Sequence, residues 1–179
     1  LFQFREEKWR VVGLGCDPER YGTRAPGTAD ESPQWLPIAP KIPGRVVYCS
    51  SPDRGLHHLL ESWPAIKAAV PHATLHIFYR LGKWIQDLAS VPYPFPSIEA
   101  LRARALYINE ALGRMSDPKW GITVRDSVSR ETIEREMAQA ECLAYPCDTI
   151  RWSEGFSCTI LEACAARACP VVMKTDALP

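Results

Sequence analysis

From Arg45 onward, short apolar runs alternate with longer stretches of helical periodicity, and this alternation limits the folds open to the chain. The apolar runs predict strands at 45–49, 74–79, 122–124, 142–145 and 170–173. Between them, apolar residues recur every three or four positions, which predicts helices within 56–66, 98–112, 129–140 and 155–166. Such alternation favours right-handed crossovers and a parallel sheet covered on both faces. We therefore predict an α/β, Rossmann-like fold.

The sequence before this alternation has a different composition. The segment 21–43 is rich in Pro, Gly, Thr, Ser and Asp, which predicts an irregular connector rather than a packed element. We interpret residues 1–20 as the remnant of a preceding domain, 21–43 as an interdomain connector and 44–179 as one domain. The chain starts at Leu1 and ends in a loop-like segment, so we expect it to be truncated at both ends.

Overall composition excludes several classes of protein. The 21 basic residues balance 21 acidic ones, which argues against a strongly basic nucleic-acid binder. The sequence has no apolar run of membrane-spanning length and does not open with a signal peptide. The seven cysteines are odd in number and contain no C-x-x-C pair, so we expect reduced thiols without structural zinc. A cytoplasmic location follows, with a peripheral position at the inner membrane face left open.

Two glutamates bracket the most informative segment. Glu154 follows a predicted strand, and seven residues separate it from Glu162 in the next helix. Gly155 permits close approach to a ligand, and the amides of 157–159 (Ser, Cys, Thr) begin the helix, which suits a diphosphate. One carboxylate can then accept hydrogen bonds from sugar hydroxyls and the other from ribose hydroxyls. The order fits a nucleoside diphosphate sugar.

This segment resembles the E-x7-E signature of retaining GT-B glycosyltransferases of the large family called family 4. The resemblance includes the Gly155-Phe156 pair and the later Pro-Val-Val strand at 170–172. It implies that Glu154 is a catalytic residue that orients the donor sugar, and that Glu162 holds the ribose. The donor-binding residues would include Gly155, Phe156, Ser157, Cys158 and Thr159. The resemblance implies no obligatory metal and no cofactor other than the nucleotide-sugar donor.

A second match lies after the first predicted strand of the domain, at Ser50-Ser51-Pro52-Asp53-Arg54-Gly55. The segment is similar to the family's phosphate-contacting loop, in which a basic residue precedes glycine. By this resemblance Arg54 is catalytic, because a guanidinium grips phosphate oxygens and offsets leaving-group charge. Ser50 and Ser51 stand where many relatives have another basic residue, and with Gly55 they complete the donor contacts. The alternative for Arg54 is a solvated loop charge or a pair with Asp53.

A third match places the nucleobase near Ser127 and Val128, after the strand at 122–124. Relatives often have glycine at the positions of Arg125 or Asp126, so an ordinary strand-to-helix turn is the alternative. His57 and His58 follow Gly55, and either a phosphate contact or partly buried surface histidines would account for them.

The resemblance covers most of the chain from Gly44 and, more faintly, 11–21. It implies the donor-binding half of a GT-B enzyme, with the C-terminal helices missing and an absent N-terminal domain packing across the cleft. The expected activity is retaining transfer of a sugar from a nucleoside diphosphate sugar to an unknown acceptor (a sugar, a lipid-linked sugar or a protein), inactive in this fragment alone. Alternatives are a noncatalytic nucleotide-sugar-binding module, or another nucleotide-sugar enzyme of GT-B fold, such as an epimerase or phosphorylase.

Overall fold

A computed structural model describes residues 15–25, 34–90, 97–148 and 156–174 of the chain. Its strands are β1 (Gly22–Ala25), β2 (Gln34–Pro37), β3 (Arg45–Tyr48), β4 (Thr74–Phe78), β5 (Ile122–Arg125), β6 (Cys142–Tyr145) and β7 (Cys169–Val172). Its α-helices are α1 (Leu56–Ala69), α2 (Leu81–Ser90), α3 (Ile98–Arg114), α4 (Arg130–Gln139) and α5 (Cys158–Ala165). Short 3₁₀ turns occupy Pro18–Arg20 and Pro118–Trp120.

The main sheet has five parallel strands in the order β5-β4-β3-β6-β7. The chain enters at the centre with β3, builds outward through β4 and β5, and then returns to the other side of β3 for β6 and β7. The order therefore reverses between β3 and β6. In open α/β sheets, ligands bind beyond the carboxyl ends of the strands at this reversal. The predicted α/β, Rossmann-like parallel sheet is confirmed.

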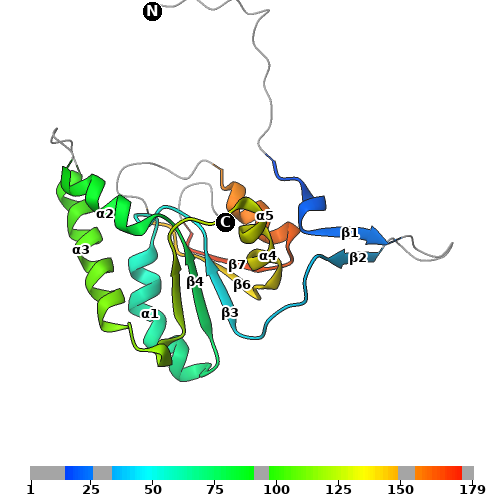
Figure 1. The fold of residues 1–179 in the computed structure, drawn as a ribbon, viewed down its shortest axis with the longest axis horizontal. Coiled ribbons are helices and arrows are strands. Elements are labelled where there is room, and N and C mark those ends of the chain that lie inside the picture. The colour runs from blue at the N-terminus through cyan, green and yellow to red at the C-terminus, as the bar shows by residue number, and fades with distance from the viewer. Residues whose placement is uncertain (1–14, 26–33, 91–96, 149–155, 175–179) are drawn as a thin grey trace, which may run out of the picture.

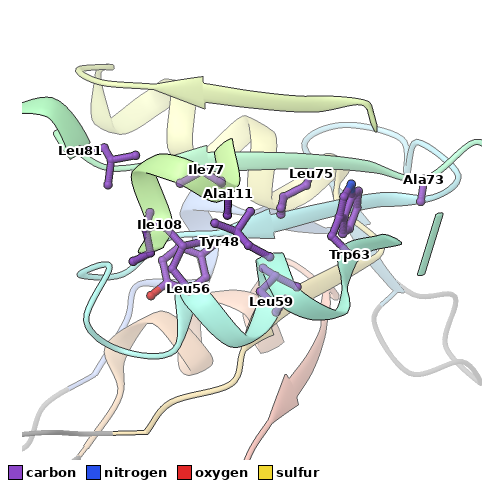
Figure 2. Close-up of a cluster of buried hydrophobic side chains, with 12 residues drawn as sticks. Tyr48, Leu56, Leu59, Trp63, Ala73, Leu75, Ile77, Leu81, Ile108 and Ala111 are labelled. Carbon is purple, nitrogen blue, oxygen red and sulfur yellow. The ribbon is translucent and has the colours of Figure 1, made fainter. Parts of the chain in front are cut away.

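Helices cover both faces of the sheet, as Figure 1 shows, with α1 and α3 on one side and α4 and α5 on the other. Side chains alternate along each strand, so neighbours serve opposite faces. Val47 packs in the cluster beneath α4 and α5, and Tyr48 packs with α1 and α3. In Figure 2, Leu75 and Ile77 of β4 face Leu56, Leu59 and Trp63 of α1 and Ile108 and Ala111 of α3.

Helix α1 continues through Pro64, where the sequence predicted a kink or restart. Proline removes one helical hydrogen bond. Burial compensates, because Leu59, Leu60 and Trp63 are all buried just ahead of it, and the Trp63 indole donates to the Trp120 carbonyl over 2.9 Å. The helix therefore does not restart at Pro64.

The predicted caps of two other helices differ in outcome. Ser129 is the N-cap of α4, and its hydroxyl accepts a hydrogen bond from the Thr132 amide, as predicted. Ser97 occupies the N-cap position of α3, but its φ of 81° places it in the left-handed region and its side chain makes no capping bond.

The expectation of an irregular connector over 21–43 is wrong for two stretches, because β1 and β2 form an antiparallel hairpin with Gly22 opposite Pro37. Tyr21, just before β1, is fully buried in the cluster that α4 and α5 cover. Lys41 ties the following segment to the domain by donating to the carbonyls of Ala140 and Ala166. The proline content of this segment suggested irregular structure. Pro37, however, lies at the end of an edge strand, where proline is tolerated. Among the described residues, no helix is long and apolar enough to cross a lipid bilayer.

Candidate functional site at the strand reversal

The hydroxyl group of Tyr48 holds the turn after β3 in place. The Tyr48 hydroxyl lies 2.7 Å from the Ser51 carbonyl and 3.1 Å from the Arg54 carbonyl. The Arg54 amide donates to the Ser51 carbonyl over 2.9 Å, and the Ser51 hydroxyl donates to the Asp53 carboxylate. The turn that carries four of the predicted donor contacts is therefore held in place at the carboxyl end of the central strand.

Gly55 joins this turn to the segment after β6. Its φ of +88° is a left-handed conformation, and a Cβ at this position would lie 1.7 Å from the Pro146 carbonyl oxygen. Glycine is therefore required twice, once for its backbone conformation and once for space. The sequence assigned Gly55 to the donor; in the structure its close neighbour is the β6 turn.

Arg54 reaches toward the end of β6. Its Nη1 lies 3.4 Å from the hydroxyl of Tyr145, the last residue of that strand. The side chain is half-buried rather than fully solvated. The guanidinium therefore lies at the junction of β3 and β6, where the strand order reverses.

The first turn of α5 lies at the same edge. The Thr159 hydroxyl donates to the carbonyl of Cys49, the residue after β3, over 3.4 Å. Ser157 is the N-cap, and its hydroxyl accepts from the Ile160 amide. The helix's own ladder does not reach the amides of Cys158 and Thr159, because the first residues of a helix have no partner within it. These amides therefore begin a helix whose N-terminus adjoins β3.

Other residues of the predicted E-x7-E segment have different outcomes. Phe156 is 46% exposed ahead of α5. Glu154 and Gly155 lie outside the described residues, so their prediction stands as made. Glu162 is 14% exposed, and its carboxylate accepts a hydrogen bond from Arg130 of α4.

Arg130 links three groups around Glu162. It donates to Glu162, to Glu134 over 3.0 Å and to the Tyr21 hydroxyl over 3.1 Å. The hydrogen bond to Glu162 raises the pKa of Arg130. Burial, followed by the nearby Glu162 carboxylate, raises the pKa of Cys49 to about 12. Glu162 lies one turn after Thr159 on α5, and a carboxylate with about four acceptor sites keeps capacity beyond Arg130. No pattern in the sequence pointed to Arg130.

A cavity of about 540 Å³ opens at the carboxyl ends of β4 and β5. Ser127 and Val128, the predicted nucleobase residues, both line it, and the Arg80 Nε donates to the Ser127 hydroxyl over 2.9 Å. Trp84 and Lys83 of α2 form another wall. The volume lies within the range of small-molecule sites. Sequence reasoning missed these α2 residues because it did not predict α2.

Two histidines and an aspartate meet on the α1 side of the strand reversal. The Nε2 atoms of His57 and His58 lie 3.6 Å and 3.0 Å from Oδ2 of Asp148, which follows β6. Arg104 of α3 grips the same carboxylate with two hydrogen bonds, of 3.0 Å and 2.9 Å. Burial, then the charges of Arg104 and His58, lowers the pKa of His57 to about 4.

This cluster was not predicted, although its position offered a signal. Asp148 lies in the segment just after the parallel strand β6, which is where ligand-facing residues of such sheets lie. Arg104 sits in the middle of a helix, where no local pattern marks it. The two histidines were noted in the sequence, and the structure assigns them a common partner.

Comparison with models of protein families and with curated proteins found no match for this chain. What the site can do therefore follows from its geometry. The Arg54 guanidinium lies near Tyr145 beside the turn after β3, the first turn of α5 contacts Cys49 after the same strand, and a cavity opens at the ends of the next two strands, β4 and β5. Guanidinium groups and helix N-termini both attract anions.

Proposed function

We propose that this chain binds a nucleoside diphosphate sugar at the strand reversal, as the donor-binding half of a retaining glycosyltransferase of GT-B fold. The observation that carries the proposal is the contact between Thr159 and Cys49, residues 110 positions apart. It supports the proposal because the two motifs that resemble the family's donor site, found separately in the sequence, adjoin one another.

The diphosphate would lie between the turn after β3 and the start of α5. Arg54 supplies positive charge there, and the amides of Cys158 and Thr159 supply donors at the positive end of the helix dipole. Ser50 and Ser51 add hydroxyl groups on the turn. In this arrangement Arg54, the helix amides and the serine hydroxyls together would offset the negative charge that develops on a leaving diphosphate. The turn then needs no second basic residue.

The nucleoside would extend from the diphosphate toward α4 and β5. Glu162 is the proposed ribose acceptor and lies on α5 against Arg130 of α4. Ser127 and Val128 line a cavity with room for a base. Aromatic walls such as that of Trp84 favour the flat apolar faces of bases.

The sugar itself is assigned to Glu154, which in the family orients the donor. Transfer to an acceptor with retained stereochemistry would need the domain that packs across the cleft in the family. The seven free thiols suit a reducing compartment, which supports a cytoplasmic location as part of the proposal.

Calorimetry with the chain itself tests the donor site. UDP, GDP and ADP are each titrated beside their matching nucleosides, without added metal. We expect at least one diphosphate to bind more tightly than its nucleoside. The groups that we assign to the ligand after β3 and at the start of α5 are mainly ones that bind phosphate. Equal affinities for every pair, or no binding of any diphosphate, would remove the assigned pocket.

A further inference from the structure

The convergence of His57, His58 and Asp148 brings together side chains that the sequence separates by about 90 positions. His57 and His58 lie in the first turn of α1, and Asp148 follows β6. One ligand-type atom from each residue lies within 4.8 Å of the others. All three side chains are partly accessible, so an ion has a route to them.

We propose that these three residues bind a divalent transition metal, with zinc as the best match. Two imidazole nitrogens and one carboxylate oxygen form a donor set that zinc uses in open sites, where a fourth position takes water or a substrate. Metal–ligand bonds of about 2.0–2.2 Å at tetrahedral angles put ligand atoms about 3.4 Å apart. The observed separations from Asp148 Oδ2, 3.0 Å and 3.6 Å, bracket that value.

The surroundings of Asp148 support a ligand role. Arg104 binds both carboxylate oxygens and also donates to the carbonyl of Asp148, so the carboxylate is held in one orientation. Ligating carboxylates are commonly fixed by such outer hydrogen bonds. Because a carboxylate has about four acceptor sites, the grip of Arg104 leaves Oδ2 able to bind a metal. The metal would take the place of the hydrogen bond between His58 Nε2 and Asp148 Oδ2.

The site adjoins the turn that carries Arg54, because Arg104 also donates to the Asp53 carbonyl. A divalent ion at this site would add positive charge beside the turn after β3. In that turn, Ser50 and Ser51 stand in place of a second basic residue. The proposal departs from the expectation of no metal, and it does not rest on the proposed function, since zinc binding is measured without nucleotide.

Zinc titration of the whole, reduced chain followed by calorimetry tests the site. We expect one zinc per chain, and at least about tenfold weaker binding in His58→Ala and in Asp148→Asn, since each loses a ligand. His72→Ala is the matched control: this exposed histidine lies away from the cluster and should leave zinc affinity unchanged. Cobalt substitution should give visible ligand-field bands without the near-ultraviolet band of thiolate coordination.

Circular dichroism establishes that each variant is folded. His58 is about a third exposed, so its replacement should not unfold the chain. Should Asp148→Asn unfold, His57→Gln takes its place with the same expected loss. Wild-type protein that binds no zinc, full affinity in folded His58→Ala, or a thiolate–cobalt band that disappears in Cys142→Ser would each overturn the proposal.

Discussion

Arg54 carries the charge of the proposed phosphate turn and lies 3.4 Å from the Tyr145 hydroxyl. Replacement by alanine removes a charged donor while Tyr48 still holds the turn from beneath. We expect Arg54→Ala to weaken UDP binding by roughly 1.5–3 kcal/mol, the range for hydrogen bonds to charged groups. Calorimetry measures it, with the exposed Arg114→Ala as control. An unchanged affinity in the folded variant would make Arg54 a structural side chain only.

The two glutamates of the E-x7-E segment should behave differently. Glu162→Gln should weaken UDP binding by roughly 1.5–3 kcal/mol, because the amide is a poorer acceptor for ribose hydroxyls. Glu154→Gln should leave UDP binding nearly intact, because its proposed partner is the sugar. Both are measured by the same titration.

Arg130 complicates Glu162→Gln, since the change also weakens its hydrogen bond. Glu134→Gln is the matched control, because Glu134 accepts from the same guanidinium but has no proposed ribose contact. If Glu134→Gln weakened UDP binding as much as Glu162→Gln, the effect would belong to Arg130 placement rather than to ribose. If Glu154→Gln abolished binding and Glu162→Gln did nothing, the two roles would be wrongly assigned.

At the scale of elements, the alternating pattern predicted the five strands of the main sheet and most helices within a few residues. One helix, α2, and one hairpin, formed by β1 and β2, were missed. Helix α2 follows β4 almost at once, and it was missed although Leu81, Trp84, Ile85 and Leu88 recur at helical spacing, so the signal was present in the sequence. The β1–β2 hairpin depends on pairing between segments, which no local window records.

The residues of the candidate site also fall into those that could be predicted from the sequence and those that could not. Residues that follow strands or begin helices could be predicted, because parallel sheets place ligands there. Arg130 and Arg104 could not, since each acts through a carboxylate 32 or 44 positions away. Lys83 and Trp84 were lost together with α2.

The contact between the β3 and β6 turns is the element-level feature most open to test. Gly55→Ala would put a methyl group 1.7 Å from the Pro146 carbonyl oxygen and force a left-handed conformation on alanine. The conformation alone costs about 1–2 kcal/mol. We therefore expect a loss of more than about 2 kcal/mol in the free energy of unfolding, measured with urea.

Gly113→Ala in α3 is the companion variant, because a Cβ there meets nothing within 4 Å. In a helix this change should be neutral or stabilise the chain by up to about 1 kcal/mol. Equal stability of the two variants would show that the turns do not pack as described.

For the whole molecule, two partly buried histidines link stability to pH. Burial lowers the pKa of His57 to about 4, and it also lowers the pKa of His76. His76 lies against Glu136, with Arg45 and Arg125 on the same carboxylate. A base whose pKa is lower in the folded state favours unfolding once the unfolded chain takes up protons, so stability is present above about pH 6.5 and is lost below it.

Urea unfolding at pH 7.5 and 5.5, with chelator present, should show a loss of about 1 kcal/mol from His57 and a further loss in the same direction from His76. His76→Gln should remove its share of this difference, and the exposed His72→Gln should remove none. A pH difference that survives in His76→Gln unchanged would mean that His76 keeps an ordinary pKa in the folded chain.

The sheet order also fixes when the proposed binding edge exists. The turn at 50–55 comes early in the domain, but its neighbour Thr159 is synthesised 110 residues after Cys49. At ribosomal rates of about 5–20 residues per second, roughly 5–20 s separate the two. During that interval β3 and β4 can pair, while the side of β3 that later receives β6 stays uncovered. On the ribosome, the edge is therefore completed only with the last helix and strand of the described chain.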